Sequence, residues 1–407
     1  MEQEISKTKS ENAKYKYLAL ATATTLVCGM MYNLTVFSDA ISATLNIGYS
    51  TISMVFSLSQ ICFCIGGFIL GIVFNKVKFR FSMIVASITM GSGLMLSSQA
   101  SEPWQLFVFY SICMNLSAGF ICKSILSAVL PWFQENPGLA SGVVLMGPGL
   151  TAFVFNYPTA QFIPIIGWRS TMLIIGVLVL LITMVAANNL KAKTYDEAFL
   201  GKDDIDQNPE FRYSTRQIIS TPKFIFIFTW AVLMLAGCTT VAGNAVSISN
   251  SFGVDVAIGA IFSMVISFAN ATSRIWYGCL YDNYGRKISM GISTGCFFAG
   301  ILLLEVAILM QILNIMFFAF IFIGIAFGGI PTITSTFTLN VFGRKNYARN
   351  YGVVGMYALF APILGTTVFS VLYGITSNYL YSLSFLVGYA IFVIVTYLTL
   401  NKVGNNK

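Results

Sequence analysis

Long apolar stretches separated by short polar segments run through the whole chain. The apolar stretches are about 20 to 28 residues long, the length that an α-helix needs to cross a bilayer, and they lack the alternation of a membrane β-barrel strand. The pattern predicts twelve transmembrane helices, at 15–41, 51–74, 81–100, 104–133, 137–165, 170–190, 223–250, 255–281, 287–310, 314–341, 346–375 and 379–401. The predicted fold class is an all-α membrane protein with both chain ends on one side of the membrane.

The composition agrees with a chain embedded in a bilayer. Of the 407 residues, 57% are hydrophobic and 9% are charged, whereas soluble domains carry roughly 25% charged residues. Mean hydropathy is +0.78, so soluble, fibrous and disordered proteins are excluded. The net charge of +8 comes from cations at helix ends and not from one basic face, so no nucleic-acid partner is expected.

Cysteine and histidine content argues against metal and cofactor chemistry. All eight cysteines fall inside apolar stretches and the chain has no histidine, so neither a disulfide framework nor a zinc site is indicated. No cluster of nucleophile, base and acid appears. We therefore predict no metal, no cofactor and no enzymatic activity. The polar segment before the first span has no signal-peptide pattern, so none is expected.

The positions of the basic residues orient the chain. If the N-terminus lies in the cytoplasm, 20 of the 23 Lys and Arg fall in cytoplasmic segments, and the three others are Lys123, Arg169 and Arg274. Cytoplasmic loops are enriched in Lys and Arg in membrane proteins. The sequence therefore predicts a multi-pass protein with both termini in the cytoplasm.

The chain divides into two similar halves. The polar connector 191–222 separates six predicted spans from six, which gives an N-terminal six-helix bundle over 1–190 and a C-terminal one over 223–407. GIVFNKVKFR, from Gly71, recurs as GCLYDNYGRK, from Gly278, 207 residues later. Such repeats are typical of transporters with two pseudo-symmetric bundles and a site between them near the midplane.

This arrangement resembles the major facilitator superfamily over nearly the whole chain. The resemblance rests on the motif Gly-x-x-x-Asp-x-x-Gly-Arg-Lys, which begins at Gly278 and continues through Asp282, Gly285 and Arg286. It implies the major facilitator fold and assigns these four residues to gating, with the Asp capping a helix end across the cytoplasmic side. The first-half copy departs from the motif because Asn75 replaces the Asp.

Two basic residues lie inside predicted spans. Arg274 is in the eighth span and Lys123 in the fourth, and a cation at a span centre costs about 2.5 to 3.5 kcal/mol on insertion scales. Arg274 could reach the cytoplasmic headgroups or pair with a helix-terminal carboxylate such as Asp282. Lys123 lies too deep for this alone and could be held by backbone carbonyls or by a carboxylate not evident in the sequence. The functional interpretation is that both grip an anion in a hydrated cavity.

Acidic residues that could neutralise these cations are scarce inside the spans. Glu305 is the only carboxylate well inside a predicted span, and it lies toward the outer end of the ninth, so we interpret it as an interfacial residue. Buried cations without a buried anion imply a partner from solution. The expected substrate is a small carboxylate anion.

A narrower resemblance fits this expectation. The chain is similar to the oxalate/formate antiporter family and to monocarboxylate transporters in the stretches GMMYNLTVF, PWFQENPGLASGVVLMGPG and SRIWYGCLYDNYGRK, and more weakly in NYG at 350–352. The resemblance implies that Arg274 is the central carboxylate ligand and that Tyr32 lines the cavity. Oxalate-type members carry a lysine where Ala358 stands here. Proton-coupled members carry an Asp where Asn270 stands, which favours anion exchange over proton symport.

The sequence thus predicts a secondary active transporter of small organic carboxylates, either a monocarboxylate or a short dicarboxylate. Alternating access between the bundles and anion exchange are expected, in the plasma membrane and as a monomer. Substrate-binding residues are predicted to be Arg274, Lys123, Tyr32 and Asn270. Proton-coupled monocarboxylate symport, a non-transporting sensor and an efflux carrier for lipophilic cations are the alternatives.

Overall fold

The computed structural model describes residues 2–73, 77–190, 214–250, 256–344, 346–376 and 379–403. Within these ranges every regular element is helical. The elements are α1 (Glu2–Cys28), the 3-10 helix η1 (Met30–Asn33), α2 (Leu34–Leu45), α3 (Tyr49–Val73), α4 (Phe79–Ser97), α5 (Pro103–Gln105), the π-helix η2 (Leu106–Asn115), α6 (Leu116–Val129), the 3-10 helix η3 (Leu130–Trp132), α7 (Pro137–Asn189), α10 (Thr215–Ile219), α11 (Pro222–Asn250), α12 (Val256–Met310), α13 (Leu313–Phe342), α14 (Tyr347–Val354), α15 (Tyr357–Thr376) and α16 (Tyr379–Val403).

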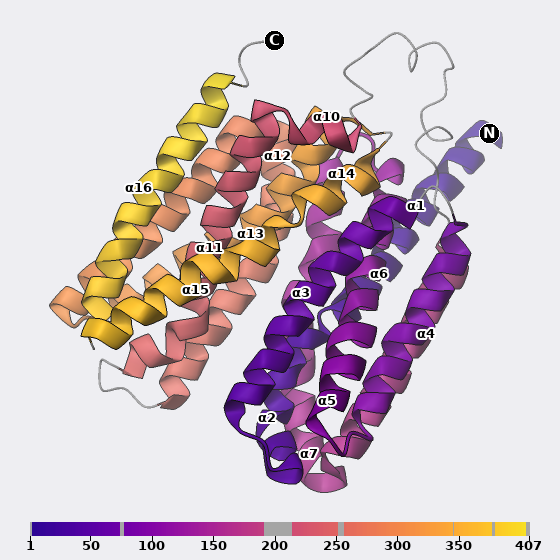
Figure 1. Ribbon diagram of the computed structural model, residues 1–407. Helices are drawn as coiled ribbons and strands as arrows, with labels where there is room; N and C mark the ends of the chain where they lie inside the picture. Colours follow the sequence, from indigo (N-terminus) through magenta and orange to yellow (C-terminus); the bar gives the residue numbers. More distant parts are fainter. Residues whose placement is uncertain are drawn as a thin grey trace.

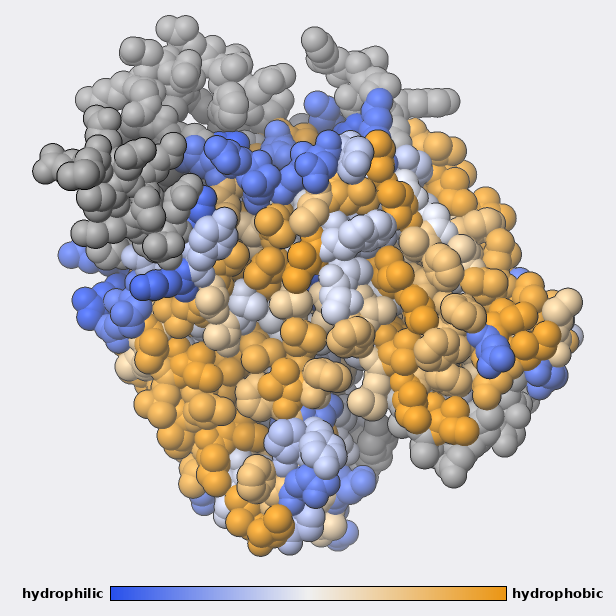
Figure 2. Space-filling model, turned by 180° about the vertical axis from the view of Figure 1, so that it is seen from behind, coloured by the Kyte–Doolittle hydropathy of each residue, from blue (hydrophilic) through white to orange (hydrophobic). Residues whose placement is uncertain are grey.

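The helices form two groups (Figure 1). Helices α1 to α7 make the N-terminal bundle and α11 to α16 make the C-terminal bundle, and α1 begins at the same side of the molecule at which α16 ends. We call this the terminal side. Figure 2 shows a broad apolar belt across one face of the molecule, with hydrophilic residues gathered above it on the terminal side. The domain limits 1–190, 191–222 and 223–407 stay predictions, and 191–213 lies outside the described residues.

The lengths of α7 and α12 show that neither is one straight span. They contain 53 and 55 residues, so each would be about 80 Å long if straight, against a hydrocarbon core of about 30 Å. Each breaks at a glycine in the left-handed region, Gly167 with φ 81° and Gly285 with φ 74°. Both breaks fall between two predicted spans.

The helical fold class is confirmed, while the count of twelve spans stays a prediction. Seven of the described helices are long and apolar enough to cross a membrane, or eight if the bent pair of α1 and α2 is one span. The count stays below twelve partly because α7 and α12 are each taken as one helix, and α15 and α16 are not among the seven. The α14–α15 pair and α16 coincide with the predicted eleventh and twelfth spans.

The first span is broken near its middle, and hydroxyl groups from two other helices stabilise the break. The helix turns by 40° between α1 and η1. Thr151 Oγ1 of α7 donates a hydrogen bond to the Leu26 carbonyl (2.5 Å), and Tyr110 Oη of η2 donates to the Met30 carbonyl (2.8 Å). These bonds satisfy carbonyl groups that the bend removes from the helix ladder, which is required inside a bilayer.

Glycines bring the two bundles into close contact on the terminal side. A Cβ on Gly71 of α3 would lie 2.7 Å from Arg349 Cα of α14, and one on Gly352 of α14 would lie 2.9 Å from the Gly67 carbonyl. A Cβ on Gly142 of α7 would overlap the backbone of α12. Figure 1 shows the two groups of ribbons meeting toward the terminal side and separating toward the opposite side. The structure therefore shows the bundles closed on the terminal side.

Candidate functional site

Arg274 is held at the interface between the bundles. It belongs to α12, and its side chain is 9% exposed. Its guanidinium donates from Nε (3.3 Å) and Nη2 (3.2 Å) to Asn270 Oδ1, one turn earlier on α12, and from Nη1 to the Leu145 carbonyl of α7. The structure thus brings together the predicted pair Arg274 and Asn270. Neither the headgroup position nor the pair with Asp282 that the sequence left open is observed.

No described carboxylate neutralises Arg274. Apart from the Lys123 ammonium, the groups within electrostatic reach of it are the hydroxyls of Tyr32, Tyr357 and Tyr351 and the thiol of Cys122. A buried cation surrounded by neutral groups has lost its water without gaining a counterion, which is unfavourable. The arrangement therefore favours the arrival of an anion.

The hydrogen bonds of Arg274 leave donors available. A guanidinium carries five N–H groups, one on Nε and two on each terminal nitrogen. Asn270 uses one on Nε and one on Nη2, and Leu145 uses one on Nη1. One N–H therefore remains on each terminal nitrogen, and two such groups suit the two oxygens of a carboxylate.

Lys123 approaches the same region from the N-terminal bundle. It lies on α6, nine residues before Trp132, and Arg274 lies eight residues before Asp282, so both are about 12 to 13 Å from the terminal ends of their spans. The charges of Lys123 and Arg274 act on each other. The Lys123 ammonium lies 3.6 Å from the centre of the Tyr351 ring of α14, and not on backbone carbonyls as the sequence had left open.

Tyr32 lies at the break of the first span. It is part of η1 and half-buried, and its ring packs against Phe56 of α3 at 6.3 Å between centres. Its hydroxyl is within electrostatic reach of Arg274. Of the four predicted substrate-binding residues, Asn270 thus binds Arg274 directly, and Lys123 and Tyr32 lie within electrostatic reach of it.

Two of the four predicted gating residues join α12 to the start of α7. Asp282 accepts hydrogen bonds from the backbone N–H groups of Gly138 (Oδ1, 2.8 Å) and Leu139 (Oδ2, 2.8 Å). Asn136, the N-cap residue of α7, makes no side-chain cap bond of its own. Asp282 therefore caps this helix from the other bundle, where a negative charge is favourable. Gly278 lies against Gly138, and a Cβ there would be 2.7 Å from the Gly138 carbonyl carbon.

The two other predicted gating residues act within the C-terminal bundle. Gly285 forms the bend in α12, and Arg286 stacks over the Phe337 ring of α13 at 5.8 Å. Asn75, which replaces the motif Asp in the first half, lies outside the described residues. Glu305 of α12 is half-buried and accepts a hydrogen bond from Ser384 of α16 (2.6 Å).

Sequence reasoning missed Tyr351 and the Leu145 carbonyl. Tyr351 lies inside the NYG stretch at 350–352, which in the sequence carries only the weakest part of the resemblance. The role of Leu145 depends on its backbone, for which the residue type carries no signal. Ala358, where oxalate-type members carry a lysine, lies in the first turn of α15.

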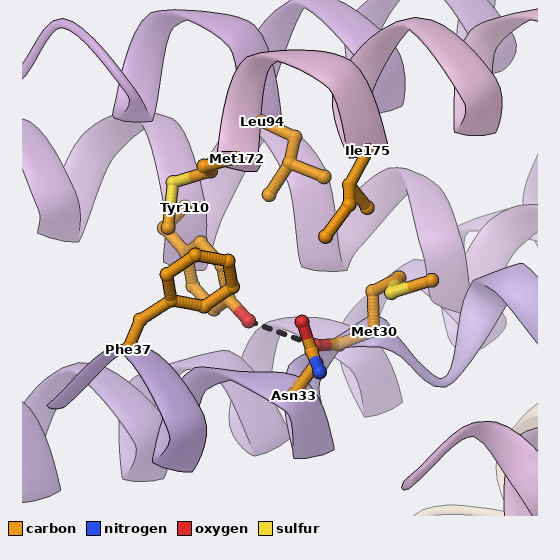
Figure 3. A pocket seen from close by; sticks show the side chains of 7 residues that line it. All are labelled: Met30, Asn33, Phe37, Leu94, Tyr110, Met172 and Ile175. Atoms are coloured by element: carbon orange, nitrogen blue, oxygen red, sulfur yellow. Dashed lines mark hydrogen bonds between the residues drawn. The ribbon is translucent and has the colours of Figure 1, made fainter. Parts of the chain in front are cut away.

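A small pocket in the N-terminal bundle lies apart from the two cations. Figure 3 shows its side chains converging between η1, α2, α4, η2 and α7, with Asn33 and the Tyr110 hydroxyl as the polar groups. None of the residues that line it is charged. They are Met30, Asn33, Phe37, Leu94, Tyr110, Met172 and Ile175. This pocket is therefore an internal packing space near the break of the first span and not the anion site.

Comparisons with known proteins agree with the helix arrangement. The sequence model of the family described as Major Facilitator Superfamily matches residues 18–245. The chain is 26% identical over 355 residues to the uncharacterized MFS-type transporter YhjX of Escherichia coli K12, covering 85% of this chain and 86% of that protein. It is 20% identical over 368 residues to human monocarboxylate transporter 2, covering 85% and 76%. Among solved structures, a double-tryptophan mutant of XylE matches with a TM-score of 0.78 at 13% identity, covering 96% of both chains.

Proposed function

The chain belongs to the major facilitator superfamily, and on this premise we propose that it is a secondary active transporter of small organic carboxylates. The observation that carries the proposal is the buried guanidinium of Arg274, which has no described acidic neighbour and retains a free N–H on each terminal nitrogen. The name of the human relative, monocarboxylate transporter 2, points to the same chemical class.

Each residue of the site has a distinct role in this proposal. Arg274 binds the carboxylate through two N–H groups, and Asn270 fixes the direction of the guanidinium. Lys123 supplies a second positive charge at a similar depth, and Tyr32 lines the region near Arg274. A monocarboxylate needs Arg274 alone, whereas a short dicarboxylate would use both cations.

Exchange of one anion for another is the proposed mode. Asn270 carries no titratable proton, and the chain contains no histidine, so the described site has neither a carboxylate nor an imidazole to carry a proton. Unbalanced anion uptake would move charge against an inside-negative potential at about 2.3 kcal/mol per elementary charge per 100 mV. Exchange avoids this cost.

The proposed setting is the plasma membrane, with a monomer whose terminal side faces the cytoplasm. The distribution of Lys and Arg supports this orientation. In that orientation, the close contacts of Gly142, Gly278 and Asp282 put the carrier in an outward-facing form. Alternating access then requires α12 to separate from α7 on the cytoplasmic side.

Counterflow in proteoliposomes tests the proposal. Vesicles loaded with unlabelled acetate, lactate, oxalate or succinate should accumulate the same labelled anion with the unmodified protein. Arg274→Lys should lose this uptake, because an ammonium cannot form the two-pronged contact. Arg80→Lys is the matched control, since Arg80 is exposed and bonds Asn188 away from the site. Normal uptake by Arg274→Lys would overturn the assignment.

A further inference from the structure

The Lys123 ammonium is docked on the opposite bundle. Lys123 belongs to α6 of the N-terminal bundle, and Tyr351, on whose ring the ammonium lies at 3.6 Å, belongs to α14 of the C-terminal bundle. Within the described residues, neither a hydrogen bond nor an ion pair holds this ammonium. The aromatic face is thus an attractive contact at short range, through the cation–π interaction, and the Tyr357 hydroxyl lies within electrostatic reach of the ammonium.

The end of α14 completes a place for a cation. The helix ends at Val354, and its cap residue Gly355 lies close to the Lys123 ammonium. A Cβ on Gly355 would be 3.3 Å from Lys123 Nζ. The C-terminal end of a helix carries partial negative charge. We call the Tyr351 ring and the Gly355 end of α14 the ammonium cradle.

The path of the lysine stem explains how it reaches the cradle. A Cβ on Gly67 of α3 would lie 2.9 Å from Lys123 Cγ and 3.5 Å from Cε. Gly67 also meets Gly352 of α14 at the bundle interface. The stem therefore passes over a glycine at the point where α3 and α14 touch, so the contact forms only while the terminal side is closed.

The ring of the cradle is fixed, whereas the lysine is the adjustable partner. Tyr351 is 1% exposed and stacks on Tyr347 at 5.5 Å with an angle of 12° between the rings. The Tyr347 hydroxyl is in turn hydrogen-bonded to Ser335 Oγ of α13 (2.7 Å). A lysine side chain has four rotatable carbon links and can turn toward Arg274 without moving these rings.

We propose that Tyr351 is a positioning residue that holds Lys123 across the bundle interface and keeps the empty carrier shut on the terminal side. An anion bound at Arg274 draws the ammonium out of the cradle, because a charge-assisted hydrogen bond is stronger than a cation–π contact. Loss of this contact lets α14 separate from α3. The anion-dependent part rests on the proposed carboxylate function, whereas the docking itself does not.

Hydrogen–deuterium exchange on the full chain in lipid nanodiscs tests this role. In the unmodified protein, backbone amides of 137–142 and 347–356 should exchange slowly, and faster when acetate, lactate, oxalate or succinate replaces chloride at constant ionic strength. Tyr351→Leu and Lys123→Met should exchange about threefold to tenfold faster in these segments without any carboxylate, as expected for loss of one cation–π contact. Both variants should show little further response to the anions.

Conservative variants separate docking from mere structural support. Tyr351→Phe keeps the ring face and Lys123→Arg keeps a cation, so both should retain slow exchange and the anion response. Exchange in 79–97 of α4, far from this contact in sequence, should stay unchanged in all variants. A Tyr351→Phe variant as open as Tyr351→Leu would overturn the cation–π role.

The outcomes also distinguish this inference from the proposed function. Slow hydrogen–deuterium exchange and a full anion response in both Tyr351→Leu and Lys123→Met would contradict the docking role of Tyr351 and leave the carboxylate assignment intact. Opening in these variants, together with no response of the unmodified protein to any of the four anions, would support the docking and count against the substrate class. If Tyr351→Leu does not fold, Lys123→Met with its Lys123→Arg partner decides the question.

Discussion

At the scale of single residues, Asn270 determines the charge of the site. Its side-chain oxygen binds two nitrogens of Arg274, as a carboxylate could, but it adds no negative charge. The guanidinium is therefore oriented and still positive. An amide at this position separates two functions that one carboxylate would combine, namely positioning of the arginine and neutralisation of it.

Replacement of Asn270 by Asp should make transport depend on pH. The new carboxylate would pair with Arg274 at neutral pH and compete with the substrate, so counterflow at pH 7.5 should fall about tenfold or more. Because an acid beside an arginine takes up a proton only as the pH falls, uptake should recover toward pH 5.5. The unmodified protein should change little over this range. A flat profile in Asn270→Asp would contradict this account.

The two intramembrane cations were predictable from sequence because charge inside an apolar stretch is conspicuous. Arg274 and Lys123 stand out in this way, and the structure brings them to the same region. The partner of Lys123 was not predictable, because Tyr351 comes from a helix more than 200 residues away. Tyrosines are frequent in this chain, with 19 in all, so none is marked by its type.

At the scale of helices, the start of α7 depends on a carboxylate from another bundle. Asp282 accepts two backbone hydrogen bonds there, and Asn136 gives none from its side chain. The motif around Asp282 was visible in the sequence. Its partner was not, because it is a pair of backbone N–H groups whose position depends on how the bundles pack.

Asp282→Asn should weaken closure on the terminal side. Loss of the charge at a helix N-terminus costs about 0.5 to 2 kcal/mol, so the open form should gain severalfold in population. Hydrogen–deuterium exchange at 137–142 should report this change, with Asn283→Ser as the control, since Asn283 is exposed and bonds only its own helix. Equal exchange in Asp282→Asn and the unmodified chain would exclude a latch at this position.

Gly278→Ala should block closure by its methyl group alone. The added Cβ would lie 2.7 Å from the Gly138 carbonyl carbon of α7, and such overpacking costs about 1 to 3 kcal/mol. Counterflow should fall markedly, while thermal unfolding in detergent should change much less, because the clash is between bundles. Gly295→Ala on the same helix is the matched control, since its Cβ would meet nothing within 4 Å. Equal loss of transport in both variants would refute the packing argument.

Predicted and observed helix limits agree best where polar residues or glycines interrupt the chain. The breaks of α7 at Gly167 and of α12 at Gly285 fall between predicted spans. The interruption at η1 was not predicted, because Gly29 lies within an unbroken apolar run. Its cause is tertiary: a Cβ at Gly29 would lie 2.7 Å from the Pro148 carbonyl of α7.

At the scale of the whole molecule, the two halves are similar in layout and unequal in their contacts. On the terminal side, α12 and α7 are joined by the Asp282 carboxylate, whereas α14 meets α3 through glycines and α6 through the docked Lys123. The repeat in the sequence predicted two similar bundles with a site between them. It did not predict that one is held by a helix cap and the other by an aromatic ring.

Exchange by this carrier should be independent of membrane potential. In the proposed exchange, one anion replaces another of equal charge in each cycle, so no net charge crosses the bilayer and the potential does no work on it. Counterflow of a single anion species should change by less than about twofold when a potassium gradient with valinomycin sets −100 or +100 mV. A strong acceleration at positive interior potential would instead indicate net anion movement.

The broken first span has a consequence for biogenesis. The carbonyls of Leu26 and Met30 are satisfied by hydroxyls of Thr151 and Tyr110, which leave the ribosome long after the first span. Until those later segments arrive, a bent first segment would leave the Met30 carbonyl without a partner and the Leu26 carbonyl with only a long bond from the Gly29 N–H (3.4 Å), and an unsatisfied carbonyl in lipid costs several kcal/mol. We therefore expect this segment to enter the bilayer as a continuous rod and to acquire its bend only when the fourth and fifth segments assemble beside it.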